Sequence, residues 1–175
     1  MVTIKDKQFS PFIDAETIQQ RLEILGEEIT KDFQEKTPIL IGILNGSFMF
    51  ISDLVKHISC PIEVSFIRIS SYEGTESTGE VTSIMGLNTD LKDRHVIIVE
   101  DIVDTGLSMY RILEELKIMQ PSSLSISTLL LKPDALKHPI ECRYIGFEIP
   151  NKFVVGYGLD YDGLGRNLPE IYQLK

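Results

Sequence analysis

A run of β-branched residues that is followed directly by two acidic residues constrains the fold of this chain more than any other feature. Val96–Val99 has the sequence Val-Ile-Ile-Val, which is typical of a buried strand, and Glu100 and Asp101 follow directly. The segment Asp104–Ser108, Asp-Thr-Gly-Leu-Ser, then leads into a helical pattern. A buried strand, a polar turn with glycine and a helix form the unit with which α/β proteins place ligands at strand carboxyl ends. We therefore predict an α/β fold with a ligand site at this turn.

The chemistry of this unit suits a phosphorylated ligand. The free N–H groups of the turn and of the helix N-terminus can bind a phosphate. The neighbouring carboxylates of Glu100 and Asp101 suit a hard cation such as Mg²⁺, which usually reaches its site together with substrate phosphates. An ordinary acidic turn before a capped helix explains each residue singly, because Asp and Thr favour both positions. It explains the whole combination poorly.

Length, composition and charge narrow the class of protein. The 175 residues suffice for one domain, residues 1–175, and the shares of apolar (43%) and charged (25%) residues are those of a soluble globular protein. The formal net charge is −9, and the sequence contains no basic run. Such a surface repels nucleic-acid backbones and anionic membranes, so we expect neither as a partner.

Cysteine usage and the N-terminus bear on the compartment. Cys60 and Cys142 lie far apart and have no Cys or His partner at metal-ligand spacing, which favours two thiols in a reducing compartment. The N-terminus has no apolar segment of signal-peptide length, and no stretch approaches ~20 apolar residues. We expect a cytoplasmic protein.

The spacing of apolar residues predicts alternating helices and strands. A helical stripe with Asp14 as N-cap covers residues 14–33, and further helices are expected at 48–57 and 109–119. Strands are expected at 38–44, 62–69, 83–87, 96–99, 124–131, 144–149 and 153–157. This alternation predicts a mainly parallel sheet flanked by helices on both faces. Residues 70–82 have no core-forming period and are interpreted as a mobile loop, and the tail 160–175 as an irregular segment packed over the site.

The strand-turn-helix segment resembles the signature of the type I phosphoribosyltransferases, which bind phosphoribosyl pyrophosphate through this loop. The likeness spans roughly residues 38–169, and its motifs occur in the order found in hypoxanthine-guanine phosphoribosyltransferases. These further motifs are Leu44–Phe48, Ser71-Tyr72, Lys132-Pro133, Lys152–Tyr161 and Arg166–Pro169. The resemblance implies the fold of that family, a mainly parallel sheet flanked by helices with a small hood made from the chain ends.

The resemblance also implies where phosphoribosyl pyrophosphate binds. The phosphate-binding positions are Glu100, Asp101, Asp104, Thr105, Gly106, Leu107, Ser108, Asn45, Gly46 and Arg166. The metal positions, for Mg²⁺, are Glu100, Asp101 and Asp160. Many relatives carry Lys at the position of Asn45, so a contact from this turn would rest on backbone N–H groups. Ser71 and Tyr72 begin a flexible loop that closes over the reacting centre in the family and excludes water.

A second set of positions implies how the purine binds. The resemblance places Asp104 beside N7 of the purine, as a general base or as a charge that stabilises the developing cation on the ribose. Lys132 can donate to a 6-oxo group but not to the 6-amino group of adenine, because an ammonium has no acceptor. Phe153 would stack on the purine, Val154 would offer backbone groups to its edge, and Asp160 would line the same site.

Together these positions imply transfer of the 5-phosphoribosyl group from phosphoribosyl pyrophosphate to hypoxanthine, and to guanine, giving IMP or GMP and pyrophosphate. The expected partners are these small molecules and further copies of the chain, in a homodimer or homotetramer. Two alternatives remain at this point. One is the same reaction on xanthine, and the other is a nucleotide-sensing regulator without enzyme activity. A regulator that binds nucleic acid needs a basic face, which the −9 charge does not favour.

Overall fold

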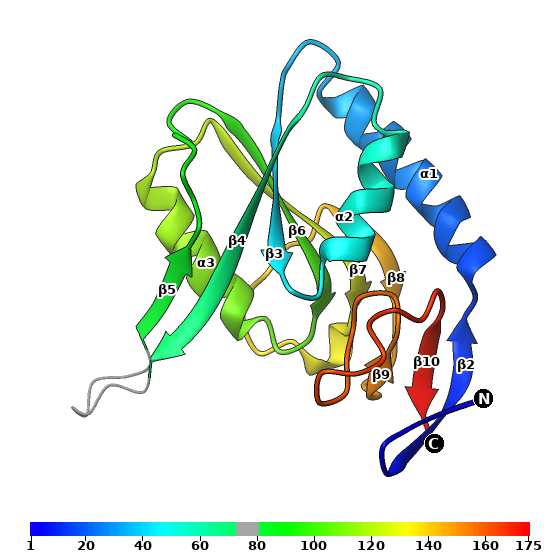
Figure 1. Ribbon diagram of the computed structural model, residues 1–175. Helices are drawn as coiled ribbons and strands as arrows, with labels where there is room; N and C mark the ends of the chain where they lie inside the picture. The colour runs from blue at the N-terminus through cyan, green and yellow to red at the C-terminus, as the bar shows by residue number, and fades with distance from the viewer. Residues whose placement is uncertain (73–80) are drawn as a thin grey trace.

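A computed structural model describes the backbone at residues 1–72 and 81–175 and shows two sheets with helices packed on the larger one (Figure 1). The elements of the first half are β1 (Val2–Ile4), β2 (Lys7–Ile13), α1 (Ala15–Asp32), β3 (Ile39–Leu44), α2 (Phe48–Leu54), the 3₁₀ turn η1 (Val55–His57), β4 (Glu63–Tyr72) and β5 (Val81–Met85). Those of the second half are β6 (His95–Val103), α3 (Leu107–Ile118), β7 (Ser123–Leu131), the 3₁₀ turn η2 (Pro133–Ala135), β8 (Tyr144–Glu148), β9 (Val154–Val155) and β10 (Ile171–Leu174).

The larger sheet has the strand order β5-β4-β3-β6-β7-β8. The strands from β4 to β8 in this order pair in parallel, and only β5 at the edge runs antiparallel to its neighbour β4. The predicted mainly parallel sheet is therefore confirmed. Because the carboxyl ends of parallel strands meet at one edge of a sheet, the loops after β3, β6 and β7 come together there.

Helices cover both faces of this sheet, as the alternating pattern predicts. Figure 1 shows α1 and α2 on one face and α3 on the other. Asp14 caps α1 by accepting a hydrogen bond from the Thr17 N–H at 2.7 Å. The apolar stripe of α1 is buried in one core cluster, and Ile112 and Leu116 of α3 belong to a second cluster on the other face. Burial of these two stripes is what holds the helices on the sheet.

Strand β6 is longer than the sequence pattern predicts, and the prediction that it ends at Val99 was wrong. Its pairing with β3 does stop at Val99, opposite Gly42. Its pairing with β7 continues, with Glu100 opposite Thr128 and the last pair at Val103. The acidic pair thus lies inside a strand that has lost its neighbour on one side only, because the chain of β3 turns away at Asn45.

The predicted loop at residues 70–82 is also shorter than expected. Strand β4 continues to Tyr72 and β5 begins at Val81, so Ser71 and Tyr72 belong to a strand at the level of the backbone. Their pairing partners in β5 are Thr82 and Val81. The expectation of a mobile loop falls on residues 73–80, which lie outside the described residues.

The two chain ends form the smaller sheet, which is antiparallel throughout and has the order β1-β2-β10-β9. It lies at one end of the larger sheet as a hood (Figure 1). The tail was predicted to be irregular, but it contains β10, whose Leu174 pairs with Phe9 of β2. Of the strand expected at residues 153–157, only β9 forms, and it belongs to the hood. In the part of the chain described, no helix is long and apolar enough to cross a membrane.

Candidate active site

Two adjacent carboxylates mark the carboxyl-terminal part of β6. The Oε2 atom of Glu100 is shielded from solvent and has no hydrogen-bond partner among the described residues. Asp101 is buried, and its Oδ1 accepts from the Ile102 N–H at 2.8 Å. Burial raises the pKa of both carboxyls, and the neighbouring charge of Asp101 adds to the effect on Glu100. An unpaired buried oxygen of this kind favours the binding of a cation or of a hydroxyl donor.

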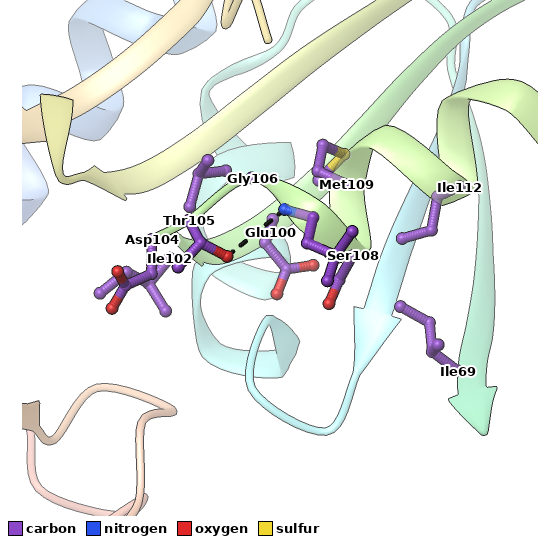
Figure 2. A pocket seen from close by; sticks show the side chains of 11 residues that line it. Ile69, Glu100, Ile102, Asp104, Thr105, Gly106, Ser108, Met109 and Ile112 are labelled. Carbon is purple, nitrogen blue, oxygen red and sulfur yellow. Dashed lines mark hydrogen bonds between the residues drawn. The ribbon is translucent and has the colours of Figure 1, made fainter. Parts of the chain in front are cut away.

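The loop after β6 forms one wall of a cavity of about 220 Å³. Figure 2 shows the loop leading into α3, with the Glu100 and Ser108 side chains directed into the space beside it. Gly106 precedes the helix with a φ of 80°, a conformation that favours glycine. Thr105 Oγ1 accepts from the Leu107 N–H at 3.5 Å, and the first N–H groups of α3 face the loop. The arrangement provides the backbone donors and hydroxyls that bind a phosphate.

Lys132 and Asp104 meet at the ends of two neighbouring strands. Lys132 directly follows β7, and its Nζ donates to Asp104 Oδ2 at 2.5 Å. The Lys132 side chain is 8% exposed, whereas that of Asp104 is 45% exposed. This convergence at strand carboxyl ends follows from the parallel pairing of β6 with β7. It creates a cationic donor and an anionic acceptor side by side, which is a suitable pair for a heterocycle with an oxo group next to a ring N–H.

The turn after β3 packs directly against the acidic pair. A Cβ atom on Gly46 would lie 1.6 Å from Asp101 Oδ2, so only glycine allows this approach. The side chain of Asn45 accepts from Arg68 Nη2 at 3.1 Å. Arg68 has no signal in the sequence, because a lone arginine in a predicted strand belongs to no motif. The structure places its guanidinium beside the turn that follows β3.

Asp160 and Arg166 form an ion pair in the loops of the hood. Arg166 Nη2 lies 2.5 Å from Asp160 Oδ1, and its Nη1 donates to the Gly158 carbonyl at 2.6 Å. The other carboxylate oxygen of Asp160 accepts from the Gly163 N–H at 2.7 Å. The charge of Arg166 also acts to lower the pKa of Asp101, against the larger effect of burial. The guanidinium therefore lies near both Asp160 and Asp101. Arg166 is thus placed to meet an anion at the same edge of the sheet.

The predicted metal positions, Glu100, Asp101 and Asp160, differ in whether their carboxylate oxygens are free to bind a cation. Among the described residues, no three His, Cys, Asp or Glu side chains come together as a metal cluster. Both oxygens of Asp160 already have protein partners, so its part in metal binding stays a prediction. Mg²⁺ commonly uses one or two carboxylates and completes its shell with waters and substrate phosphates. The unpaired Oε2 atom of Glu100 and the adjacent Asp101 fit a cation that arrives with a phosphorylated ligand.

Aromatic residues of the hood surround Phe153. Phe153 is 43% exposed, and its ring contacts those of Phe9 and Tyr161, with ring centroids 6.3 and 5.9 Å away. Lys7 Nζ lies 4.6 Å from the centre of the Tyr161 ring and 5.7 Å from that of Phe153. Val154 is buried, and its backbone is in β9, opposite Gln173 of β10. An exposed ring supported from behind can stack on a flat ligand.

The sequence of this chain is similar to those of known phosphoribosyltransferases. The family model described as phosphoribosyl transferase domain matches residues 14–162 of this chain. A protein of Staphylococcus aureus strain Mu50 named hypoxanthine-guanine phosphoribosyltransferase is 48% identical over 161 residues, which cover 91% of this chain and 90% of that protein. A protein of Bacillus subtilis strain 168 with the same name is 43% identical over 164 residues, covering 93% of this chain and 91% of that protein.

A solved structure agrees with this likeness along nearly the whole chain. The crystal structure of a hypoxanthine phosphoribosyltransferase from Staphylococcus aureus superimposes with a TM-score of 0.89 and 45% sequence identity. The superposition covers 97% of this chain and 92% of that one. The large parallel sheet, the flanking helices and the hood therefore recur together in a solved relative.

Proposed function

The chain belongs to the phosphoribosyl transferase family, and from this membership we propose that it is a hypoxanthine-guanine phosphoribosyltransferase of purine salvage. It transfers the 5-phosphoribosyl group from phosphoribosyl pyrophosphate to hypoxanthine or guanine, with IMP or GMP and pyrophosphate as products. The names of the relatives at 48% and 43% identity support this choice of base. The observation in the site that carries it is the pairing of Lys132 with Asp104 at the ends of β7 and β6.

This pair suits the edge of a 6-oxopurine. The Lys132 ammonium has three donors, so it can hold the 6-oxo group while it remains oriented by Asp104. The Asp104 carboxylate is the more exposed of the two. It accepts the proton from N7 of the base when the other nitrogen of the imidazole ring attacks the ribose. The bond between the anomeric carbon and pyrophosphate breaks as the new bond to the purine forms. A nearby carboxylate also stabilises the positive charge that develops on the ribose ring.

The remaining residues of the site bind phosphoribosyl pyrophosphate, some at its ribose 5′-phosphate and others at its pyrophosphate. The loop Asp104–Ser108 and the N-terminus of α3 hold the 5′-phosphate, while Glu100 and Asp101 bind the ribose hydroxyls. The turn at Gly46 and the guanidinium of Arg166 hold the pyrophosphate. Phe153 stacks on the purine, and the buried strand at Val154 fixes the height of that ring.

Mg²⁺ is the cofactor that this arrangement fits. Glu100 and Asp101 would hold it together with the oxygens of phosphoribosyl pyrophosphate, and Asp160 would contribute through water. When bound, the ion neutralises charge on the leaving pyrophosphate. The protein residues supply the remaining donors, since Arg166 and the backbone of the turn face the same anion.

Two further properties belong to the proposal. We expect a homodimer or homotetramer, because Phe48, Val64 and Phe66 at α2 and β4 are 42%, 46% and 40% exposed, and such apolar side chains favour contact with another copy. Light scattering after gel filtration would test this. We also propose a cytoplasmic location, which the two free cysteines support.

A panel of bases tests the proposed reaction. The purified protein is incubated with phosphoribosyl pyrophosphate, Mg²⁺ and one of hypoxanthine, guanine, xanthine or adenine, and the release of pyrophosphate is measured. We expect product with hypoxanthine and guanine and none above background with adenine. Equal turnover of adenine would contradict the role of Lys132. A preference for xanthine would replace the base assignment, and no product with any base would overturn the proposal.

A further inference from the structure

A buried tyrosine links the hood to the helices at some distance from the reacting groups. Tyr157 is 2% exposed, and its hydroxyl donates to Asp53 Oδ2 of α2 at 2.6 Å. Gln19 of α1 donates to the same carboxylate oxygen at 3.2 Å, and Lys56 Nζ lies 2.6 Å from its other oxygen. Burial and the bond to Asp53 both raise the pKa of Tyr157, so its hydroxyl stays protonated and acts as a donor. Asp53 therefore connects the hood to α2 through a hydrogen bond between side chains.

The backbone around Tyr157 has a conformation that requires support. Gly156, Tyr157 and Gly158 have φ values of 98°, 48° and 101° in succession. This region favours glycine, and a tyrosine there is held against its local preference. Backbone bonds from Tyr157 N–H to Leu168 and from Gly158 N–H to Arg166 contribute, at 2.8 and 3.0 Å. The short side-chain bond to Asp53, together with a longer one from Gln19 Nε2 to the Tyr157 hydroxyl at 3.5 Å, ties this loop to the helices.

This loop packs against the turn that closes the anion site. A Cβ atom on Gly158 would lie 2.1 Å from the carbonyl oxygen of Gly46. Gly46 is itself pressed against Asp101, since its own added Cβ would lie 1.6 Å from that carboxylate. The Gly46 turn leads directly into α2, the helix that carries Asp53. Tyr157 and α2 are therefore connected in two ways. One connection is the hydrogen bond to Asp53, and the other is the packing of Gly158 on the Gly46 turn, which leads into α2.

We propose that the Tyr157–Asp53 bond positions the purine-binding strand β9 and the pyrophosphate turn relative to one another, so that one contact outside the reacting centre sets the affinity for both substrates. The inference rests on the proposed function. Neither residue touches the reacting atoms, and both act through the backbone at Gly158 and Gly46. Loss of the bond lowers the fraction of molecules with both loops in place, and apparent affinity falls by that fraction.

Tyr144 provides a matched control for the test. It is also 2% exposed, and its hydroxyl also donates to a helix carboxylate, that of Asp32, at 2.7 Å. It lies at the start of β8, the edge of the sheet opposite to the candidate site. Tyr144→Phe and Tyr157→Phe thus remove the same group from the same kind of environment. Any general cost of deleting a buried hydroxyl appears in both variants.

Steady-state kinetics with both substrates varied, together with thermal unfolding, test the proposal. We expect Tyr157→Phe to raise KM for hypoxanthine and for phosphoribosyl pyrophosphate by about fivefold each, with kcat within about twofold of wild type, because a lost hydrogen bond changes an equilibrium by about this factor. Tyr144→Phe should lower the melting temperature similarly but leave both KM values unchanged. Unchanged KM values in Tyr157→Phe, or an equal rise in Tyr144→Phe, would overturn the proposal.

Variants of Asp53 keep the test decisive if Tyr157→Phe folds poorly. Asp53→Ala removes the acceptor from a partly exposed position and should reproduce the rise in both KM values. Asp53→Asn keeps an acceptor oxygen for the tyrosine hydroxyl and should restore KM to within about twofold of wild type. Equal KM values for Ala and Asn would contradict a positioning role. Absence of transferase activity in the wild-type protein would instead refute the proposed function, so the two failures are distinct.

Discussion

The Lys132 ammonium donates to the Asp104 carboxylate at 2.5 Å, although 28 residues separate them along the chain. Each follows one of two neighbouring parallel strands, β6 and β7, whose last paired residues are Val103 and Leu131. The register of the sheet therefore brings them together, without any contact between their loops being needed. A nearly buried cation beside a half-exposed carboxylate is an arrangement that a ligand completes from the solvent side.

Replacement of Lys132 should affect base recognition more than turnover. We expect Lys132→Ala to raise KM for hypoxanthine by about 10- to 100-fold, the range for a lost hydrogen bond to a charged group, and to reduce discrimination against adenine. Steady-state kinetics with hypoxanthine, guanine and adenine measure both effects. Lys117→Ala, at an exposed position near the end of α3, serves as the control. Unchanged selectivity in Lys132→Ala would refute the 6-oxo contact.

Removal of divalent cations should abolish turnover. Glu100 has an unpaired buried oxygen beside Asp101, and pyrophosphate would otherwise leave with its charge uncompensated. We expect transfer to fall to background in excess EDTA and to return when Mg²⁺ is added beyond the chelator. Full activity that persists in EDTA would remove the metal role assigned to these carboxylates.

A methyl group on Gly46 should disrupt the site. The added Cβ would overlap Asp101 Oδ2, so either the turn or the carboxylate must move. We expect Gly46→Ala to lower kcat/KM at least about tenfold, since small displacements of positioning groups have effects of this size or larger. Gly26→Ala is the control, because its added Cβ would lie 2.4 Å from His57 Cβ, an overlap between α1 and η1 that involves no residue of the candidate site. It should lose stability and keep kcat/KM, and equal losses of kcat/KM would contradict the close approach.

The reactivity of Cys142 gives a pH-dependent check on the packing. Burial raises the pKa of its thiol to about 11, so little thiolate is present at neutral pH. A raised thiol pKa shifts the onset of thiolate formation to higher pH. We expect alkylation of the native protein by iodoacetamide to accelerate about tenfold per pH unit between about pH 7.5 and 9.5, measured by mass spectrometry of the Cys142 peptide. A plateau near pH 8.5, the ordinary thiol pKa, would show that the thiol is exposed.

The sequence was informative where the relevant contacts are local. The apolar run at Val96–Val99, the polar turn with Gly106 before α3 and the cap at Asp14 depend on neighbouring residues, and each was predicted at its observed place. The meeting of Asp104 and Lys132 also follows from local patterns, because both come directly after apolar strands in a parallel sheet. Their direct contact also requires that β6 and β7 are neighbours in the sheet, which the structure shows.

Features that depend on distant contacts were missed or misjudged. The pairing of β2 with β10 joins the two chain ends, and neither segment alone has a strong strand pattern. The extension of β6 past Val99 depends on continued pairing with β7, which overrides the unfavourable burial of two acids. The bond from Tyr157 to Asp53 spans 104 residues and has no sequence signal besides an unusual pair of flanking glycines.

The most direct test of the central claim is the turnover of Asp104→Asn. The substitution keeps the size of the side chain and an acceptor oxygen for Lys132, but it removes the charge and the base. Pre-steady-state and steady-state kinetics with hypoxanthine and saturating phosphoribosyl pyrophosphate should show kcat lower by about 10²- to 10⁴-fold, the usual range for a general base, with a much smaller change in KM. A variant that retains the wild-type kcat would show that Asp104 is not the catalytic group.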